Sequence, residues 1–371
     1  MPADETWTHT ALAQQIVFGA GALGRLPNLL NVLGMRSVLL VTTAGRAASG
    51  DGQRVIRGIG RSLTSTFDRV ESHVPVPLVQ EALRQARRDG VDGIVSFGGG
   101  SCADLGKAVA FFTEQEQGVP ATTFADRPVL PHVAIPTTYS GAELTPVFGM
   151  TDPSTRQKQG AGGPTSAPVA TIHDPDLTID TPPRVSAETG MNALGHCVEV
   201  AWSPHRTPEA EAIALAGILR IHNALPRVYD DPIDRDARTD MLAAAVLAGR
   251  CLSNAAMGVH HGLSQMVGAR SGIAHGLANA LILSHAIRFN AEADPAAVRR
   301  IGAALGAPDD PAGAVEALNA RLGLDRRWGD VGVAPEDLDA VAELAPGNRN
   351  VVNNPRPVSE DDARAILAAN E

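Results

Sequence analysis

The sequence predicts two domains, an α/β N-terminal domain over residues 1–182 and an all-helical C-terminal domain over residues 183–371. Three observations support this prediction. Short apolar runs alternate with helical patterns in the first half of the chain. Strand patterns stop near residue 183, where TPPRVSAETG places two prolines at a natural boundary. Helical patterns then follow one another towards the end of the chain.

The expected strands of the first domain are short apolar runs that end in turn-forming residues. In order they are QQIVF at 14–18, SVLLVTT at 37–43, GIVSFGGGS at 93–101, LPHVAIPTT at 130–138 and APVATIHDP at 167–175. Between the second and the third, VPLVQEALRQARRDG has apolar residues at helical spacing and ends at Gly90. Strands and helices that alternate in this way form a parallel, Rossmann-like sheet with helices on both faces.

The second domain shows four clear helical patterns. They are PEAEAIALAGILRIHNALPRVY at 208–229, RTDMLAAAVLAGRCLSNAA at 238–256, HGLANALILSHAIRFN at 275–290 and SEDDARAILAAN at 359–370. Each places apolar residues three or four positions apart, which is typical of a helix that packs on one face.

Composition excludes several classes of protein. The net charge is −10 and no basic stripe occurs, which argues against nucleic acid as a partner. No run approaches the ~18 apolar residues of a membrane span. The three cysteines, Cys102, Cys197 and Cys251, are scattered, which favours a reducing compartment over a disulfide framework. The first residues carry acids and no basic region typical of a secretory signal. We therefore expect a cytoplasmic enzyme with a small-molecule substrate.

A glycine-rich loop, FGGGSCADLGKA at 97–108, follows an expected strand and opens a helix. Successive glycines let the backbone approach a ligand, and a helix N-terminus presents unpaired N–H groups to an anion. The alternative is a simple tight turn. Lys107 is one of only two lysines in the chain, with Lys158. Its compact ammonium suits a position beside a phosphate or a substrate, although chance retention would also explain it.

Polar residues gather at two further places. IPTTYSGAELTP at 135–146 offers a cluster of hydroxyl groups after a strand, suited either to ligand binding or to an ordinary turn. MNALGHCVE at 191–199 places Asn192 and His196 four residues apart, on one face of a helix. GVHHGLSQMVGARSGIAHGLANA at 258–280 adds further histidines. This spacing suits part of a metal site, yet Asn192 stands where a divalent ion would favour a carboxylate.

Taken in order, these motifs resemble the iron-containing alcohol dehydrogenase superfamily, which also includes glycerol dehydrogenases and, more distantly, dehydroquinate synthases. The resemblance runs from FGAGAL at 18–23 to NNPRPVSEDDARAIL at 353–367. It implies a dehydroquinate synthase-like fold. Within the group, IPTTYSGAELTPVFGMTD, GMNALGHCVE and NPRPV are most similar to maleylacetate reductases, which reduce maleylacetate to 3-oxoadipate with NADH or NADPH.

The resemblance implies NADH or NADPH as the cofactor. The residues it assigns to the cofactor are Thr43, Gly98, Gly99, Gly100, Ser101, Asp104, Thr137, Thr138, Ser140 and Lys158. Relatives that prefer NAD often carry an aspartate at the position of Thr43. The neutral Thr43 and the nearby Arg46 therefore permit NADPH without excluding NADH.

Metal-dependent relatives bind iron or zinc through one aspartate and three histidines. The matching residues here are Asn192, His196, His261 and His275. Because the neutral Asn192 removes the carboxylate, we expect these residues to bind substrate or to catalyse without a metal. Two other interpretations stay open: the three imidazoles hold zinc or iron, or they are ordinary buried histidines.

A second departure from the family is Gln265, which stands where most relatives carry another histidine near the nicotinamide. Glutamine carries no proton at neutral pH, so His261, His260 or water would have to deliver one. Tyr139, His260 and Arg270 are further candidates for substrate contact, Arg270 because arginine binds carboxylates bidentately. Their structural alternatives are a turn, core packing and a solvated surface arginine, respectively.

We therefore expect an NAD(P)H-dependent reductase of the maleylacetate type that works without metal, as a homodimer, by hydride transfer to a ketone carbon. Two alternatives remain. One is a metal-dependent alcohol dehydrogenase with a weakened site. The other is an enzyme of specialised metabolism on the same fold, with another substrate or a reaction without net redox change; Gln265 keeps this alternative open.

Overall fold

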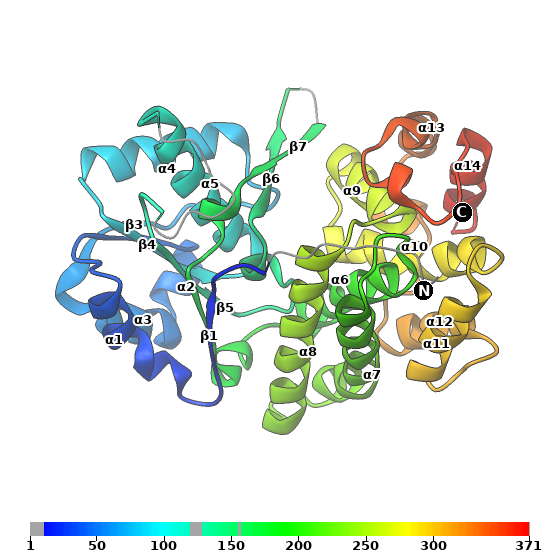
Figure 1. Cartoon of the computed structure of the whole chain (residues 1–371), viewed down its shortest axis with the longest axis horizontal. Helices are drawn as coiled ribbons and strands as arrows, with labels where there is room; N and C mark the ends of the chain where they lie inside the picture. Colours follow the sequence, from blue (N-terminus) through cyan, green and yellow to red (C-terminus); the bar gives the residue numbers. More distant parts are fainter. Residues whose placement is uncertain (1–10, 119–127, 155–156, 371) are drawn as a thin grey trace.

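The computed structural model describes residues 11–118, 128–154 and 157–370. A part built around a sheet and a part built of helices lie side by side (Figure 1). The first half of the chain forms the sheet part and the second half forms the helical part, which confirms the predicted fold class. The helix α6 begins at Pro183. The division into domains at that residue remains a prediction.

The sheet has six strands, and every pairing in it is parallel. In spatial order the strands are β1 (Gln15–Phe18), β8 (Ala170–His173), β5 (His132–Pro136), β4 (Gly93–Gly98), β2 (Val38–Val41) and β3 (Leu63–Phe67). Because all strands run the same way, the loops that follow β2, β4 and β5 meet at one edge of the sheet.

Helices cover both faces of the sheet. They are α1 (Leu26–Val32), α2 (Ala44–Ala48), α3 (Gly50–Ile59), α4 (Val76–Arg88) and α5 (Gly100–Glu116). Successive side chains of a strand point to opposite faces. In β2, accordingly, Leu40 packs in the cluster that contains α1 and α3, whereas Leu39 packs in the cluster that contains α4 and α5. This burial on both faces explains why the strands read as continuous apolar runs.

The helical part is built around α6, whose core-facing residues join the largest apolar cluster. Its helices are α6 (Pro183–Trp202), α7 (Pro208–Asp230), α8 (Arg235–Asn254), α9 (Val259–Ser271), α10 (His275–Asn290), α11 (Pro295–Ala304), α12 (Pro311–Arg321), α13 (Pro335–Leu344) and α14 (Glu360–Ala368). α6 is in contact with α7, α8, α9 and α10. Side chains on α6 therefore meet those of several other helices.

Sequence reasoning missed a two-stranded antiparallel hairpin, β6 (Val147–Asp152) and β7 (Gln157–Gly162). It rises between the two parts of the molecule, near α9 (Figure 1). Its glycines and glutamines have little intrinsic preference for strands, so the pattern gave no signal.

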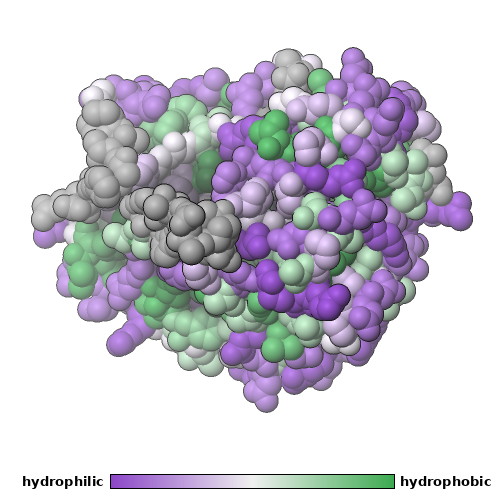
Figure 2. Space-filling model, turned by 45° about the vertical axis from the view of Figure 1, so that its right-hand side comes forward, coloured by the Kyte–Doolittle hydropathy of each residue, from purple (hydrophilic) through white to green (hydrophobic). Residues whose placement is uncertain are grey.

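The length and apolar character of the described helices bear on membrane insertion. Within the described residues, no single helix is both long and apolar enough to cross a membrane; α8 and α9 pass that test only as a pair, and they are bent by 101° relative to each other. Figure 2 brings the helical part forward and shows mainly hydrophilic side chains on this face, with apolar ones scattered among them.

Candidate active site

The glycine-rich loop lies at the edge of the sheet and packs closely on its neighbours. Gly98 ends β4 with a φ of +144°, and a Cβ there would lie 2.6 Å from Cys102 Sγ. A Cβ on Gly100 would lie 2.8 Å from Ser140 Oγ. The chain therefore needs glycine here, and the two polar loops are in contact. At the N-terminus of α5, no side chain of the described residues caps the helix. Its first amide groups therefore suit an anionic ligand.

The second polar loop, which follows β5, contains two buried threonine hydroxyl groups. Thr137 Oγ1 and Thr138 Oγ1 are buried without a hydrogen bond to any described residue. Buried polar atoms are normally satisfied, so a ligand is the natural partner for both. Thr181 Oγ1 donates to Thr137 O (2.7 Å) and accepts from Arg46 Nη2 (2.8 Å). This contact joins the loop to the segment that precedes α6.

Lys107 does not have the expected role beside a phosphate. Its side chain is fully buried in α5, and its ammonium lies 2.8 Å from Asp104 Oδ1. It also donates to the carbonyl groups of Ala142 and Val147. The ammonium therefore fixes the start of β6 and the end of the hydroxyl-rich loop. Asp104 is its partner, which agrees with a supporting role for that carboxylate.

Thr43 and Lys158 are two other residues expected at the cofactor. Thr43 caps α2, and its hydroxyl accepts from Arg46 N at 3.3 Å. Lys158 pairs with Thr151 in the β6–β7 hairpin. The Lys158 side chain lies outside the described side chains.

Three of the predicted histidines come together from three helices. His196 lies on α6, His261 on α9, and His275 is the first residue of α10. The ring centroids of His196 and His261 are 4.5 Å apart, and those of His261 and His275 are 6.0 Å apart. His196 Nδ1 and His261 Nε2 are buried without a hydrogen-bond partner among the described residues. Such orphaned nitrogens are typical of a site that holds a ligand.

Glu199 fixes His261 from behind, and sequence reasoning missed it. Its carboxylate is buried on α6 and accepts from the backbone N–H groups of Gly258 (3.1 Å), His260 (2.9 Å) and His261 (3.2 Å). It also accepts from His261 Nδ1 at 2.7 Å. The same carboxylate therefore caps the start of α9 and sets the orientation of one imidazole.

The hydrogen bonds around Glu199 define the tautomers of two histidines. A carboxylate only accepts, so His261 carries its proton on Nδ1 and directs the Nε2 lone pair away from Glu199. His260 Nε2 lies 2.9 Å from Asn279 O, which also only accepts. His260 therefore has an Nδ1 lone pair, which faces His261 Nδ1 at 3.2 Å. Both nitrogens of His260 are thus used inside the protein, so it is a supporting residue and not the substrate contact we expected.

The pKa values of His196 and Glu199 are both shifted downwards. Burial, and then the neighbouring His261 and His275, hold the pKa of His196 well below its ordinary value. Burial opposes ionisation of Glu199, but the hydrogen bond and the charge of His261 outweigh it and lower the pKa of Glu199. Glu199 is therefore a carboxylate at neutral pH.

Asn192 is held in one orientation by Asn279 of α10. Asn279 Nδ2 donates to His275 O (2.8 Å) and to Asn192 Oδ1 (3.0 Å). A carbonyl oxygen only accepts, so the first contact identifies the Asn279 atom as nitrogen, and the Asn192 atom that faces it must be oxygen. The Asn192 oxygen therefore accepts a hydrogen bond from Asn279. In this orientation the amide nitrogen of Asn192 is the group that does not face Asn279.

Two expected substrate residues lie elsewhere. Tyr139 is fully buried, and its hydroxyl accepts from Nη1 of the equally buried Arg238 at 3.1 Å. Arg270 forms an ion pair with Asp337 of α13, with Nε 3.3 Å from Oδ1. Both therefore have structural partners in place of a ligand. Gln265 lies on α9 one turn after His261, and its Oε1 accepts from Asn350 Nδ2 at 3.1 Å.

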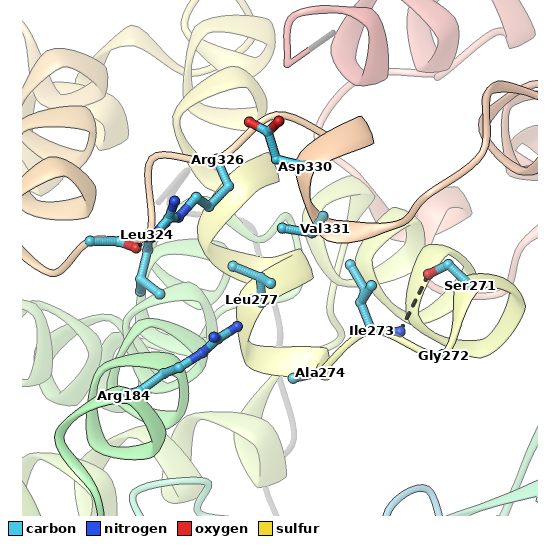
Figure 3. A pocket seen from close by; sticks show the side chains of 11 residues that line it. Arg184, Ser271, Gly272, Ile273, Ala274, Leu277, Leu324, Arg326, Asp330 and Val331 are labelled. Atoms are coloured by element: carbon cyan, nitrogen blue, oxygen red, sulfur yellow. Dashed lines mark hydrogen bonds between the residues drawn. The ribbon is translucent and has the colours of Figure 1, made fainter.

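A cavity of about 520 Å³ opens beside the turn that precedes His275 (Figure 3). It is lined by Ile273, Ala274 and Leu277, and by Arg184 and Arg326 among others. The Arg184 and Leu277 side chains project towards its centre in Figure 3. The cavity adjoins the histidine cluster through α10, but none of the three clustered histidines lines it.

The residues present fit a divalent ion less well than a site with a carboxylate would. Three imidazoles are suitable ligands, but the fourth position offers an uncharged amide, whose oxygen already accepts a hydrogen bond from Asn279. Among the described residues, Glu199, His260 and His261 also lie close enough together to suggest a metal site. Their ligand atoms, however, already bond to one another and to backbone N–H groups.

The buried histidines make stability depend on pH. Burial lowers the pKa of His132 to about 3 and that of His260 to about 4, and it lowers that of His196 as well. An unfolded histidine has a pKa near 6.5. Below that pH the unfolded chain binds protons that the folded chain refuses, so stability present above pH ~6.5 is lost as the pH falls.

We expect each of these three histidines to lower the free energy of unfolding by up to about 1.4 kcal/mol for each pH unit of acidification between about pH 6.5 and pH 5. Urea unfolding at several pH values in this window would measure the slope. An unfolding free energy that stays constant there would contradict the assignment of neutral buried histidines.

A parallel sheet with two polar loops at its edge lies beside a helical part with a buried histidine cluster, and family models that match both parts identify the chain as an oxidoreductase that acts on CH–OH or ketone groups. The chain belongs to the iron-containing alcohol dehydrogenase family. The model of "Iron-containing alcohol dehydrogenase" matches residues 13–175, and that of "Fe-containing alcohol dehydrogenase family, C-terminal" matches residues 186–370.

Individual relatives extend over nearly the whole chain. A maleylacetate reductase of Burkholderia cepacia is 35% identical, over 95% of this chain and 94% of its own length. The crystal structure of a maleylacetate reductase from Agrobacterium tumefaciens superposes with a TM-score of 0.86 at 31% identity, covering 99% of this chain and 98% of the other. A sulfoacetaldehyde reductase from Bifidobacterium kashiwanohense, solved in complex with NAD+, superposes with a TM-score of 0.89 at 25% identity, covering 99% of each chain. The family and this complex support a nicotinamide cofactor.

Proposed function

We propose that this chain is a maleylacetate reductase that reduces maleylacetate to 3-oxoadipate with NADH or NADPH and needs no bound metal. The relatives support the substrate, because maleylacetate reductases match it over nearly its full length. The observation that supports metal independence is the orientation of Asn192, whose oxygen is bonded to Asn279. The position that carries a carboxylate in metal-dependent relatives thus offers an uncharged amide, which includes an N–H donor.

The chemistry of the substrate refines the expected hydride acceptor. Maleylacetate and 3-oxoadipate both contain the ketone, so the bond that is reduced is the carbon–carbon double bond conjugated to it. Reduced nicotinamide, when bound, supplies a hydride. Hydride addition to the alkene carbon remote from the ketone leaves an enolate. A proton then adds to the other alkene carbon, which is bonded to the ketone carbon. Hydride transfer to the ketone carbon itself would give a hydroxy acid, so for this substrate we propose the alkene carbon as the hydride acceptor in place of the ketone carbon.

The residues of this chain stabilise the enolate and supply the proton. Asn192 Nδ2 and the neutral His196 donate hydrogen bonds to the enolate oxygen, which carries the developing charge. His261 Nε2, which carries a lone pair in the resting tautomer, first takes up a proton from solvent and then delivers it to the substrate carbon. Glu199, at 2.7 Å from Nδ1, stabilises the imidazolium form between these two steps. Gln265 takes no part in proton transfer.

The residues expected near the ribose 2′ position favour neither NADH nor NADPH. Thr43 lacks the negative charge that repels a 2′-phosphate, and the guanidinium of Arg46 is already bonded to Thr181. We therefore propose that both NADH and NADPH are accepted.

The test is maleylacetate reduction by purified protein before and after exhaustive treatment with EDTA, followed by nicotinamide absorbance with both cofactors. Metal content is measured on the same samples. We expect equal turnover before and after treatment, with much less than one metal ion per chain. Activity that disappears with EDTA and returns with Fe²⁺ or Zn²⁺ would instead favour the metal-dependent alternative. No turnover under any condition would refute the substrate.

A further inference from the structure

The substrate of the proposed function carries two carboxylates, and the cluster of His196, His261 and His275 includes no arginine or lysine to bind them. Arg270 is paired with Asp337. Arg356 stacks over the Phe289 ring, with its Cζ 4.1 Å from the centroid, and donates to Phe289 O. Arg270, which the sequence suggested as a substrate contact, and Arg356 of the NPRPV segment therefore have other partners.

A third arginine lies on a segment that packs directly on α9. A Cβ at Gly262 of α9 would lie 2.4 Å from Val351 Cγ2, so this segment and the helix are in close contact. Asn350 Nδ2 donates to Gln265 Oε1 at 3.1 Å. Gln265 follows His261 by one helical turn, or ~6 Å along the axis. The residue beside Asn350 is Arg349.

Arg349 reaches from the helical part to the hairpin of the sheet part. A Cβ at Gly160 of β7 would lie 3.6 Å from Arg349 Nη1 and 3.8 Å from Nη2. Gly160 lies two residues beyond Lys158, one of the expected cofactor residues. The guanidinium therefore lies beside β7, the strand that contains Lys158, and its own residue precedes Asn350, which is bonded to Gln265.

The guanidinium of Arg349 has its donors available. It makes neither an ion pair nor a side-chain hydrogen bond within the described ranges, and the side chain is exposed. Gly160 presents no side chain to cover it. A guanidinium offers five N–H donors in a planar fork that matches a carboxylate.

We propose that Arg349 binds a carboxylate of the substrate and makes the site selective for oxo-acids with a carboxylate remote from the reacting carbons. The Asn350–Gln265 hydrogen bond holds the segment in place. This inference names the substrate class and rests on the proposed function. Gln265 then has a positioning role, because its hydrogen bond with Asn350 holds the segment that carries Arg349.

The test compares Arg349→Gln, Arg349→Lys and the control Arg299→Gln. Arg299 lies exposed on α11 and, within the described residues, forms no ion pair. We expect R349Q to raise KM for maleylacetate about ten- to hundredfold, the usual effect of losing a hydrogen bond to a charged group, with kcat within a few-fold. R349K should show a smaller increase, because an ammonium cannot bind bidentately. R299Q should match the wild type, and all variants should melt at similar temperatures.

A binding measurement separates this inference from the proposed function. Adipate, an unreactive six-carbon dicarboxylate, is titrated into each protein in complex with reduced cofactor, and nicotinamide fluorescence is followed. We expect binding to wild type and a loss of about tenfold or more in R349Q. If the wild type reduces maleylacetate but R349Q has the same KM and binds adipate equally well, the role of Arg349 is overturned and the proposed function stands. Adipate binding that depends on Arg349, without any maleylacetate turnover, would overturn the proposed function alone. Wild type that neither reduces maleylacetate nor binds adipate would overturn both.

Discussion

Replacing Asn192 by aspartate is expected to turn the site, which we propose to work without metal, into a metal-binding one and to abolish most metal-free turnover. Aspartate has the shape of asparagine and would still accept the hydrogen bond from Asn279. Its second oxygen would replace the N–H donor beside His196 with a charged ligand. One carboxylate and three imidazoles form a donor set suited to zinc or iron.

The expected size of both effects is large. Loss of a donor to a developing oxyanion typically costs about 10²- to 10³-fold in kcat, and a second negative charge would add to that cost. Metal content, measured by mass spectrometry after growth with added zinc or iron, should rise from a trace to about one ion per chain. Asn31→Asp is the matched control, since Asn31 is exposed on α1 in the sheet part. A variant N192D that stays free of metal and keeps its full activity would refute the donor role of Asn192.

The fold could be predicted from the sequence because the relevant signals are local. The apolar strands, the glycines after β4 and the four-residue spacing of Asn192 and His196 all reflect neighbouring residues. The β6–β7 hairpin was missed because its pairing is set by contacts with α5 and α9, not by its own composition.

The roles of polar residues depended on contacts that are distant in sequence. Lys107 suggested a phosphate ligand, yet its ammonium is satisfied by carbonyl groups some 35 and 40 residues away. Tyr139 suggested a substrate contact, yet Arg238 takes its hydroxyl from 99 residues away. Glu199 and Asn279 carry no special pattern, because a single acid or amide on a helix usually faces solvent. Only their burial beside His261 and Asn192 reveals what they do.

Replacing Glu199 by glutamine is expected to lower kcat about 10²- to 10³-fold while KM changes little, because Glu199 acts through His261 and not on the substrate. A glutamine oxygen still accepts from the backbone of α9. Its amide nitrogen, however, cannot accept the proton on His261 Nδ1. His261 would then lose both its fixed tautomer and the negative charge that stabilises its imidazolium form.

Glu199→Asp and Glu336→Gln are the informative companions. E199D keeps the charge on a shorter side chain and should recover part of kcat, whereas Glu336 is exposed on α13 and its variant should behave as wild type. The hydrogen bond with His261 holds the pKa of Glu199 below its ordinary value despite burial, so its contribution to stability is present at neutral pH and is lost only as the pH falls below ~4.3. E199Q should therefore unfold at lower urea concentration at neutral pH, by about 2 kcal/mol, and the difference should shrink in acid. A normal kcat in a correspondingly destabilised E199Q would show that Glu199 only caps α9. A lowered kcat that E199D restores would instead require the carboxylate behind His261, since a cap alone does not determine which nitrogen of an imidazole carries the proton.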